Sequence, residues 1–154
     1  MRIELSKANK IIIKLGSSII DNRDEMTING ICANIAKYLQ ENKEVILVTS
    51  GAISQGMNVM DVKNKPKDIK KLQSLAAVGQ QKLMSMYEKI FSEHDFQTAQ
   101  VLITHNDIND RVRYLNIKGT LEELLNNRVI PIINENDVVS VSYTHLRAHE
   151  TLLD

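Results

Sequence analysis

The stretch Glu44-Val-Ile-Leu-Val-Thr-Ser-Gly-Ala52 decides the fold class of this chain. Its first six residues form an apolar, β-branched run, which predicts a buried strand over 44–49. The run then stops at Ser50-Gly51-Ala52, a set of small residues that is typical of a strand-to-helix turn. The stretch therefore predicts a buried strand that leads directly into a helix.

Strand-like and helix-like segments alternate along the rest of the chain. The other predicted strands are 10–15, 97–103 and 129–133. Apolar residues at helical spacing predict three long helices over 27–41, 72–94 and 110–127. The segment 61–71 is lysine-rich and contains Pro66, which predicts a surface loop. The alternation predicts an α/β fold with right-handed crossovers and a mostly parallel sheet covered by helices on both faces.

The bulk composition excludes several classes of protein. The chain contains 19 Lys and Arg residues against 19 Asp and Glu residues, and this balance argues against a general nucleic-acid binder. Cys32 is the only cysteine, so an internal disulfide is impossible and a reducing cytoplasm is expected. No stretch is long and apolar enough for us to expect a membrane span.

Small or polar residues follow three of the four predicted strands, as Gly16-Ser17-Ser18, Thr49-Ser-Gly-Ala52 and Asn134-Glu-Asn-Asp137. Ligands of open parallel sheets bind beyond the carboxyl ends of the strands. We therefore expect a binding site at this edge of the sheet.

Lys14 lies just before the first of these turns. Gly16 would let the backbone approach a phosphate closely, while Ser17 and Ser18 add donors. Taken alone, the segment is equally compatible with a strand lysine beside an ordinary tight turn.

Each of the other two polar segments that follow a strand also has two possible interpretations. Successive N–H groups after Thr49 could hold a carboxylate or phosphate, or the turn could serve chain geometry alone. The carboxylates and amides of 134–137 suit an ammonium group or a metal, and the alternative is a capped polar turn.

Taken together, several segments resemble the glutamate 5-kinase family of the amino-acid kinase superfamily. The matching stretches are KLGSS (14–18), VTSGAISQG (48–56), LAAVGQQKLM (75–84), DRVRYLN (110–116) and VIPIINEND (129–137). The resemblance implies an open αβα sandwich that binds L-glutamate, with ATP largely on the other half of the domain. It implies phosphorylation of the side-chain carboxylate to glutamyl 5-phosphate, the first step of proline biosynthesis. Mg²⁺, feedback inhibition by proline, a homo-oligomer and a cytoplasmic location are also implied.

The resemblance also implies roles for individual residues. Lys14 would be catalytic and would neutralise the transferring phosphoryl group, which Gly16 and Ser17 would cradle. Phosphoryl transfer depends mainly on positioning and charge stabilisation, which suits these residue types. The implied glutamate-binding residues are Ser50, Gly51, Asn134 and Asp137, with Asp137 facing the ammonium group, and no residue is assigned to a metal.

The sequence departs from the family pattern after Ser140. Residues 141–151 read VSYTHLRAHET, which resembles a translated sequencing adapter. His145 and His149 have the spacing of a zinc pair on a helix, but we interpret this spacing as an accident of reading frame. We expect 1–140 to be the N-terminal, glutamate-binding half of a kinase domain and 141–154 to be a non-native tail. The polypeptide as it stands is expected not to phosphorylate glutamate.

Two other functions remain open at this point. A sister amino-acid kinase would act on another carboxylate, and the LAAVGQ and INEND segments argue against it. A non-catalytic small-molecule binding module would keep the sheet and lack catalysis.

Overall fold

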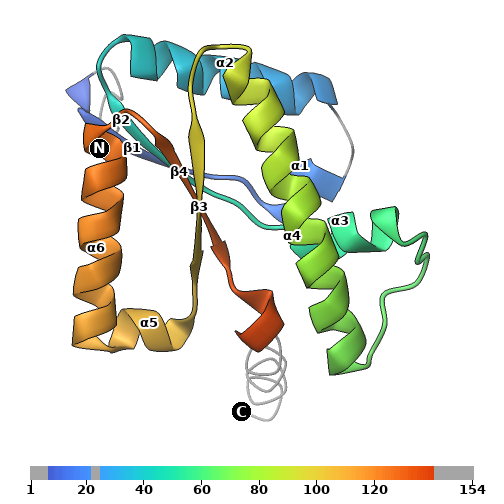
Figure 1. Ribbon diagram of the computed structural model, residues 1–154. Helices are drawn as coiled ribbons and strands as arrows, with labels where there is room; N and C mark the ends of the chain where they lie inside the picture. Colours follow the sequence, from blue (N-terminus) through green and yellow to red (C-terminus); the bar gives the residue numbers. More distant parts are fainter. Residues whose placement is uncertain (1–6, 22–24, 141–154) are drawn as a thin grey trace.

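A four-stranded parallel sheet organises the molecule, for which the computed structural model describes residues 7–21 and 25–140 (Figure 1). The strands are β1 (Lys10–Lys14), β2 (Glu44–Val48), β3 (Thr98–Ile103) and β4 (Ile130–Glu135), and their order in the sheet is β1-β2-β4-β3. All three strand pairings are parallel, which confirms the predicted α/β class. The expected tail, 141–154, lies outside the described residues.

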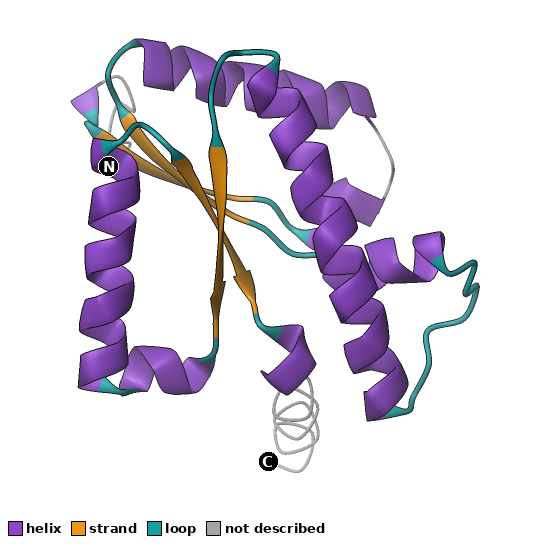
Figure 2. Ribbon diagram, in the orientation of Figure 1, coloured by secondary structure: helices purple, strands orange, loops and turns teal. Residues whose placement is uncertain are grey.

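Helices connect the strands and cover the sheet from two sides. They are α1 (Ser17–Asp21), α2 (Glu25–Gln40), α3 (Ala52–Val59), α4 (Ile69–Ser92), α5 (His105–Asn109) and α6 (Arg111–Asn126). Figure 2 shows α2 and α4 on one side of the strands and α6 on the other. Within the described ranges, no helix is long and apolar enough to cross a membrane.

The predicted element boundaries differ from the observed ones in places. Helices α1 and α5 were not predicted, because five residues are too few to show helical periodicity. The expected loop is too long by three residues, since α4 begins at Ile69. Its N-cap is Asp68, whose carboxylate accepts a hydrogen bond from the Lys70 N–H at 2.8 Å. Strand β4 runs two residues beyond its predicted end, so that Asn134 belongs to the strand.

The hydrophobic core lies between the sheet and the pair α2 and α4. The central strands contribute Val45, Leu47, Ile130 and Ile132, and α4 contributes Leu83, Tyr87 and Phe91. Cys32 of α2 is completely buried, and burial raises the pKa of its thiol to about 12. Cys32 therefore belongs to the hydrophobic core.

Two glycines allow α3 and α4 to touch backbone to backbone. A Cβ atom built on Gly79 would lie 1.7 Å from the Ala52 carbonyl oxygen, and one on Gly56 would lie 1.9 Å from the Leu75 carbonyl oxygen. No side chain can occupy these spaces. The contact holds the first turn of α3, directly after β2, in a fixed position against α4.

Candidate functional site

The strand register places the predicted polar segments at one edge of the sheet. Lys14 pairs with Val48, and Val48 pairs with Ile133 on β4. The pairing continues past the strand ends, because the Leu15 N–H donates to the Val48 carbonyl and the Thr49 N–H donates to the Ile133 carbonyl, both at 2.8 Å. The ends of β1, β2 and β4 therefore lie side by side.

Lys14, Ser50 and Asn134 line one pocket of about 310 Å³, which we call the Lys14 pocket. His105 and Glu135 line it as well. The Lys14 side chain is exposed, while Ser50 is half-buried and donates a hydrogen bond from Oγ to the Leu15 carbonyl at 3.2 Å. A cation that remains accessible beside a fixed hydroxyl can neutralise a negatively charged group entering the pocket.

Ser17, Gly51 and Asp137 line a second and larger pocket of about 700 Å³, which we call the Asp137 pocket. The sequence-predicted residues are thus divided between two pockets at the same edge of the sheet. Gly16 lines neither pocket, and its carbonyl accepts a hydrogen bond from the Ile19 N–H at 3.2 Å in the turn that starts α1.

Gly51 adopts a backbone conformation that favours glycine. Its φ is +97°, and a Cβ atom there would also come within 3.0 Å of the Ile20 side chain. It forms the N-cap of α3 without a side-chain capping bond. The N–H groups that begin α3 thus border the Asp137 pocket, where the helix dipole favours an anionic group.

The Asn134 side chain is held by neighbours on both of its polar atoms. It is only 5% exposed, its Nδ2 donates to Gln80 Oε1 at 2.8 Å, and its Oδ1 accepts from the Glu135 N–H at 2.8 Å. Gln80 in turn donates from Nε2 to Gln100 Oε1 at 3.0 Å. This chain of amides fixes the orientation of Asn134 at the pocket wall. The role of Gln80 was not predicted, although it lies in the quoted LAAVGQ segment.

Asp137 is a partly buried carboxylate with a perturbed proton affinity. Burial and, after it, the nearby Glu135 carboxylate raise its pKa from 3.8 to about 6, while Lys65 acts in the opposite direction. A buried anion of this kind gains from a cationic ligand, because the ligand charge replaces the lost hydration.

The raised pKa predicts how stability depends on pH. The folded state holds the Asp137 proton up to about pH 6, whereas an unfolded chain releases it near pH 3.8, so this group lowers stability as pH rises across that window. Asp137→Asn mimics the protonated form. We expect the variant to melt at a higher temperature than the wild type at pH 7.5 and at the same temperature near pH 3.5.

Thermal melts at both pH values of wild type and Asp137→Asn check this prediction. Asp61→Asn is the control, because Asp61 is exposed in the described structure and borders the same pocket. A pH-independent difference between Asp137→Asn and the wild type would contradict the assignment.

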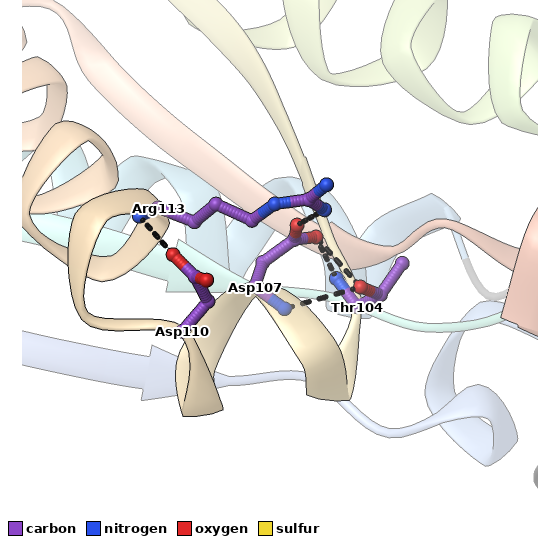
Figure 3. A network of polar contacts seen from close by, with 4 residues as sticks. All are labelled: Thr104, Asp107, Asp110 and Arg113. Carbon is purple, nitrogen blue, oxygen red and sulfur yellow. Dashed lines mark hydrogen bonds and ion pairs between the residues drawn. The ribbon is translucent and has the colours of Figure 1, made fainter.

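A network of polar side chains follows the end of β3 (Figure 3). This is the one strand end to which no binding segment was assigned from the sequence. Thr104 and Asp107 form a capping box at the start of α5, and Asp107 Oδ1 accepts from Arg113 at 2.9 Å. The hydrogen bond from the Thr104 side chain, then that from Arg113, and then that from the Thr104 N–H lower the pKa of Asp107. Asp110 caps α6 by accepting from the Arg113 N–H at 2.9 Å. The network orders the chain beside a pocket of about 340 Å³ that also reaches Glu135.

Lys63 and Lys65 line the Asp137 pocket, although the sequence indicated only a solvated surface for this loop. Their side chains are exposed, as expected. Nothing in a lysine-rich segment says which of its members face a site, since that depends on the path of the loop.

Comparisons with known proteins match this chain to one protein family. The model of the amino acid kinase family matches residues 9–147. Curated relatives include the glutamate 5-kinases of Paraburkholderia phymatum and Burkholderia ambifaria, each 43% identical over 156 residues that cover 99% of this chain. The glutamate 5-kinase of Nitrosospira multiformis is 41% identical over the same length. The chain spans 42% of the length of these relatives.

A solved structure shares the fold at lower sequence similarity. The crystal structure of smu.665 from Streptococcus mutans superposes with a TM-score of 0.54 and 18% identity, and covers 82% of this chain and 58% of that one. At this identity the likeness concerns the fold alone.

Proposed function

Since the chain belongs to the amino acid kinase family, we propose that it forms the N-terminal, substrate-binding part of a glutamate 5-kinase. The complete enzyme would transfer the γ-phosphoryl group of ATP to the side-chain carboxylate of L-glutamate. A carboxylate oxygen forms the new bond to phosphorus, the bond to the bridging oxygen of ADP breaks, and the products are glutamyl 5-phosphate and ADP. The reaction is the first step of proline biosynthesis.

One observation supports this proposal above the others: an accessible lysine and a partly buried carboxylate line neighbouring pockets at the same sheet edge. In the proposed complex, Asp137 holds the substrate ammonium while Ser50 and Gly51 hold the glutamate between the two pockets. Lys14 neutralises the phosphoryl group in the Lys14 pocket. That Gly16 and Ser17 cradle this group stays a prediction, because Ser17 lines the Asp137 pocket and Gly16 lines neither pocket. Asn134 contributes its remaining hydrogen-bonding capacity next to Ser50.

Phosphoryl transfer needs little covalent help from the protein. The reacting oxygens must be held in line, and negative charge on the phosphoryl group must be balanced. Lys14 and the N–H groups at the start of α3 supply positive charge and oriented dipoles at this edge. Mg²⁺ is proposed as the companion of the ATP phosphates. The described residues hold no group of three or more His, Cys, Asp or Glu suited to a metal.

We also propose that proline inhibits the enzyme and that the enzyme forms a homo-oligomer. Proline has an ammonium and a carboxylate on one carbon, as glutamate does, so Asp137 could hold either molecule. Exposed apolar side chains on α5 and α6 favour a homo-oligomer: Ile108, Val112, Tyr114 and Leu115. A cytoplasmic location is proposed as well, because the reaction consumes cellular ATP.

Asp137→Asn should test the substrate assignment in a full-length enzyme with this N-terminal sequence. Losing the anion opposite the substrate ammonium is expected to raise the KM for glutamate by roughly 10- to 100-fold. The KM for ATP should change by less than about twofold, because ATP is proposed to lie largely on the other half of the domain. Steady-state kinetics with each substrate varied in turn measure both values. The opposite pattern, or a wild-type preference for another carboxylate, would contradict the assignment.

We also propose that the substrate-binding part ends near Ser140 and that 141–154 is a non-native tail. The support is the string VSYTHLRAHET over 141–151, which resembles a translated sequencing adapter. The family match points the other way, because it extends to residue 147 and includes the start of that tail. The DNA that follows the Ser140 codon in the source gene tests this division.

A further inference from the structure

The loop between α3 and α4 is anchored at both ends, and this anchoring brings two lysines to the Asp137 pocket. At its start, the Met60 N–H donates to the Gly56 carbonyl at 3.0 Å and the Val62 N–H donates to the Met57 carbonyl at 2.8 Å. At its end, Asp68 caps α4. Lys63 and Lys65 lie between these anchors and line the pocket, whereas Lys67 does not.

The pocket therefore presents both signs of charge. Asp137 is partly buried on one wall, and Lys65 acts on its carboxylate electrostatically through space. A second acidic residue, Asp21, accepts a hydrogen bond from Ser54 Oγ. An α-amino acid has the complementary pattern, because its ammonium and its carboxylate are attached to the same carbon.

We propose that Lys65 binds the α-carboxylate of the amino-acid substrate while Asp137 binds its ammonium, so that Lys65 determines specificity for a free α-carboxylate. This inference rests on the proposed function of the site. Lys63 lines the same pocket and adds positive charge there.

A phosphate group is the less suitable partner for Lys65. The Asp137 pocket is also lined by Asp21 and Asp61, whose carboxylates repel a multiply charged phosphate more strongly than a single carboxylate. Lys14 lines the separate Lys14 pocket and serves the transferring group there. Lys65 thus binds the α-carboxylate of the substrate, and Lys14 neutralises the phosphoryl group that is transferred to its side-chain carboxylate.

A comparison of two ligands on two proteins isolates the proposed contact. The ligands are L-glutamate and its α-amide, which keeps the ammonium and the side-chain carboxylate but lacks the α-carboxylate charge. Titration calorimetry on the complete 154-residue chain measures their dissociation constants. We expect the wild type to prefer glutamate by roughly tenfold, which is the size of a charge-assisted contact. Lys65→Met should reduce this preference to less than about twofold.

The design separates the direct contact from an indirect effect through Asp137. The alternative is that Lys65 acts only on the charge state of the Asp137 carboxylate. In that case Lys65→Met would weaken the binding of both ligands equally, because both carry the ammonium, and the preference for glutamate would persist. Lys67→Met removes the same charge from the same loop outside the pocket lining, and it should keep the wild-type preference. Lys65→Arg should retain most of it.

Each outcome has a defined meaning. A preference that survives Lys65→Met overturns the inference and leaves the proposed function standing. Equal loss of preference in Lys65→Met and Lys67→Met would show a general effect of loop charge and would also overturn it. Failure of the wild type to bind glutamate at all would overturn the proposed function together with the inference.

Discussion

Gly79→Ala is expected to lower the free energy of unfolding by about 3 kcal/mol or more, a large part of the stability of a typical domain. The added methyl would lie 1.7 Å from the Ala52 carbonyl oxygen and 2.3 Å from the Gly56 nitrogen. Both are backbone atoms, so no change of rotamer can relieve the overlap. Helix α3 would have to move away from α4.

Two other helical glycines provide matched controls for Gly79→Ala. A Cβ atom on Gly30 or on Gly119 would meet nothing within 4 Å. Alanine is favoured over glycine inside a helix by up to about 1 kcal/mol, so Gly30→Ala and Gly119→Ala should be neutral or slightly stabilising. Urea unfolding of the three variants measures the differences. Similar stability changes in all three would mean that α3 and α4 do not touch as described.

Lys14→Ala is expected to reduce turnover by about 10²- to 10³-fold in a full-length enzyme with this N-terminal sequence, and to change the KM for glutamate far less. The Lys14 ammonium is the positive charge that the proposed mechanism places beside the transferring phosphoryl group. A contact that strengthens as charge develops affects turnover, whereas ground-state binding depends on other residues.

Lys10→Ala is the matched control for Lys14→Ala. Lys10 lies at the opposite end of the same strand and forms an exposed ion pair with Glu44 at 3.1 Å. Exposed pairs contribute little to stability, so Lys10→Ala should behave like the wild type. Steady-state kinetics that show full turnover in Lys14→Ala, or an equal loss in Lys10→Ala, would remove Lys14 from the catalytic role.

The sequence by itself determined the strands, their parallel arrangement and the edge of the sheet where the candidate site lies. Val45 and Leu47 belong to a continuous apolar run, and only a strand covered on both faces requires such a run. Such strands alternate along the chain with long helices, and this order is compatible with few sheet topologies. The polar residues after β1, β2 and β4 had to meet at one edge, because parallel strands end on the same side.

Only the tertiary structure decided how that edge is divided and which loop residues join it. Lys14 and Ser17 are close in sequence, yet they line different pockets, because β1 ends at Lys14 and α1 begins at Ser17. Lys65 and Lys67 are chemically identical neighbours, and the anchored path of the loop directs only one to the pocket. From the sequence alone, Gly79 is only a residue that weakens a helix. Its close contact with the Ala52 carbonyl, which excludes a side chain, is visible only in the structure. In each case the deciding contact joins segments distant in sequence, and local patterns contain no information about such contacts.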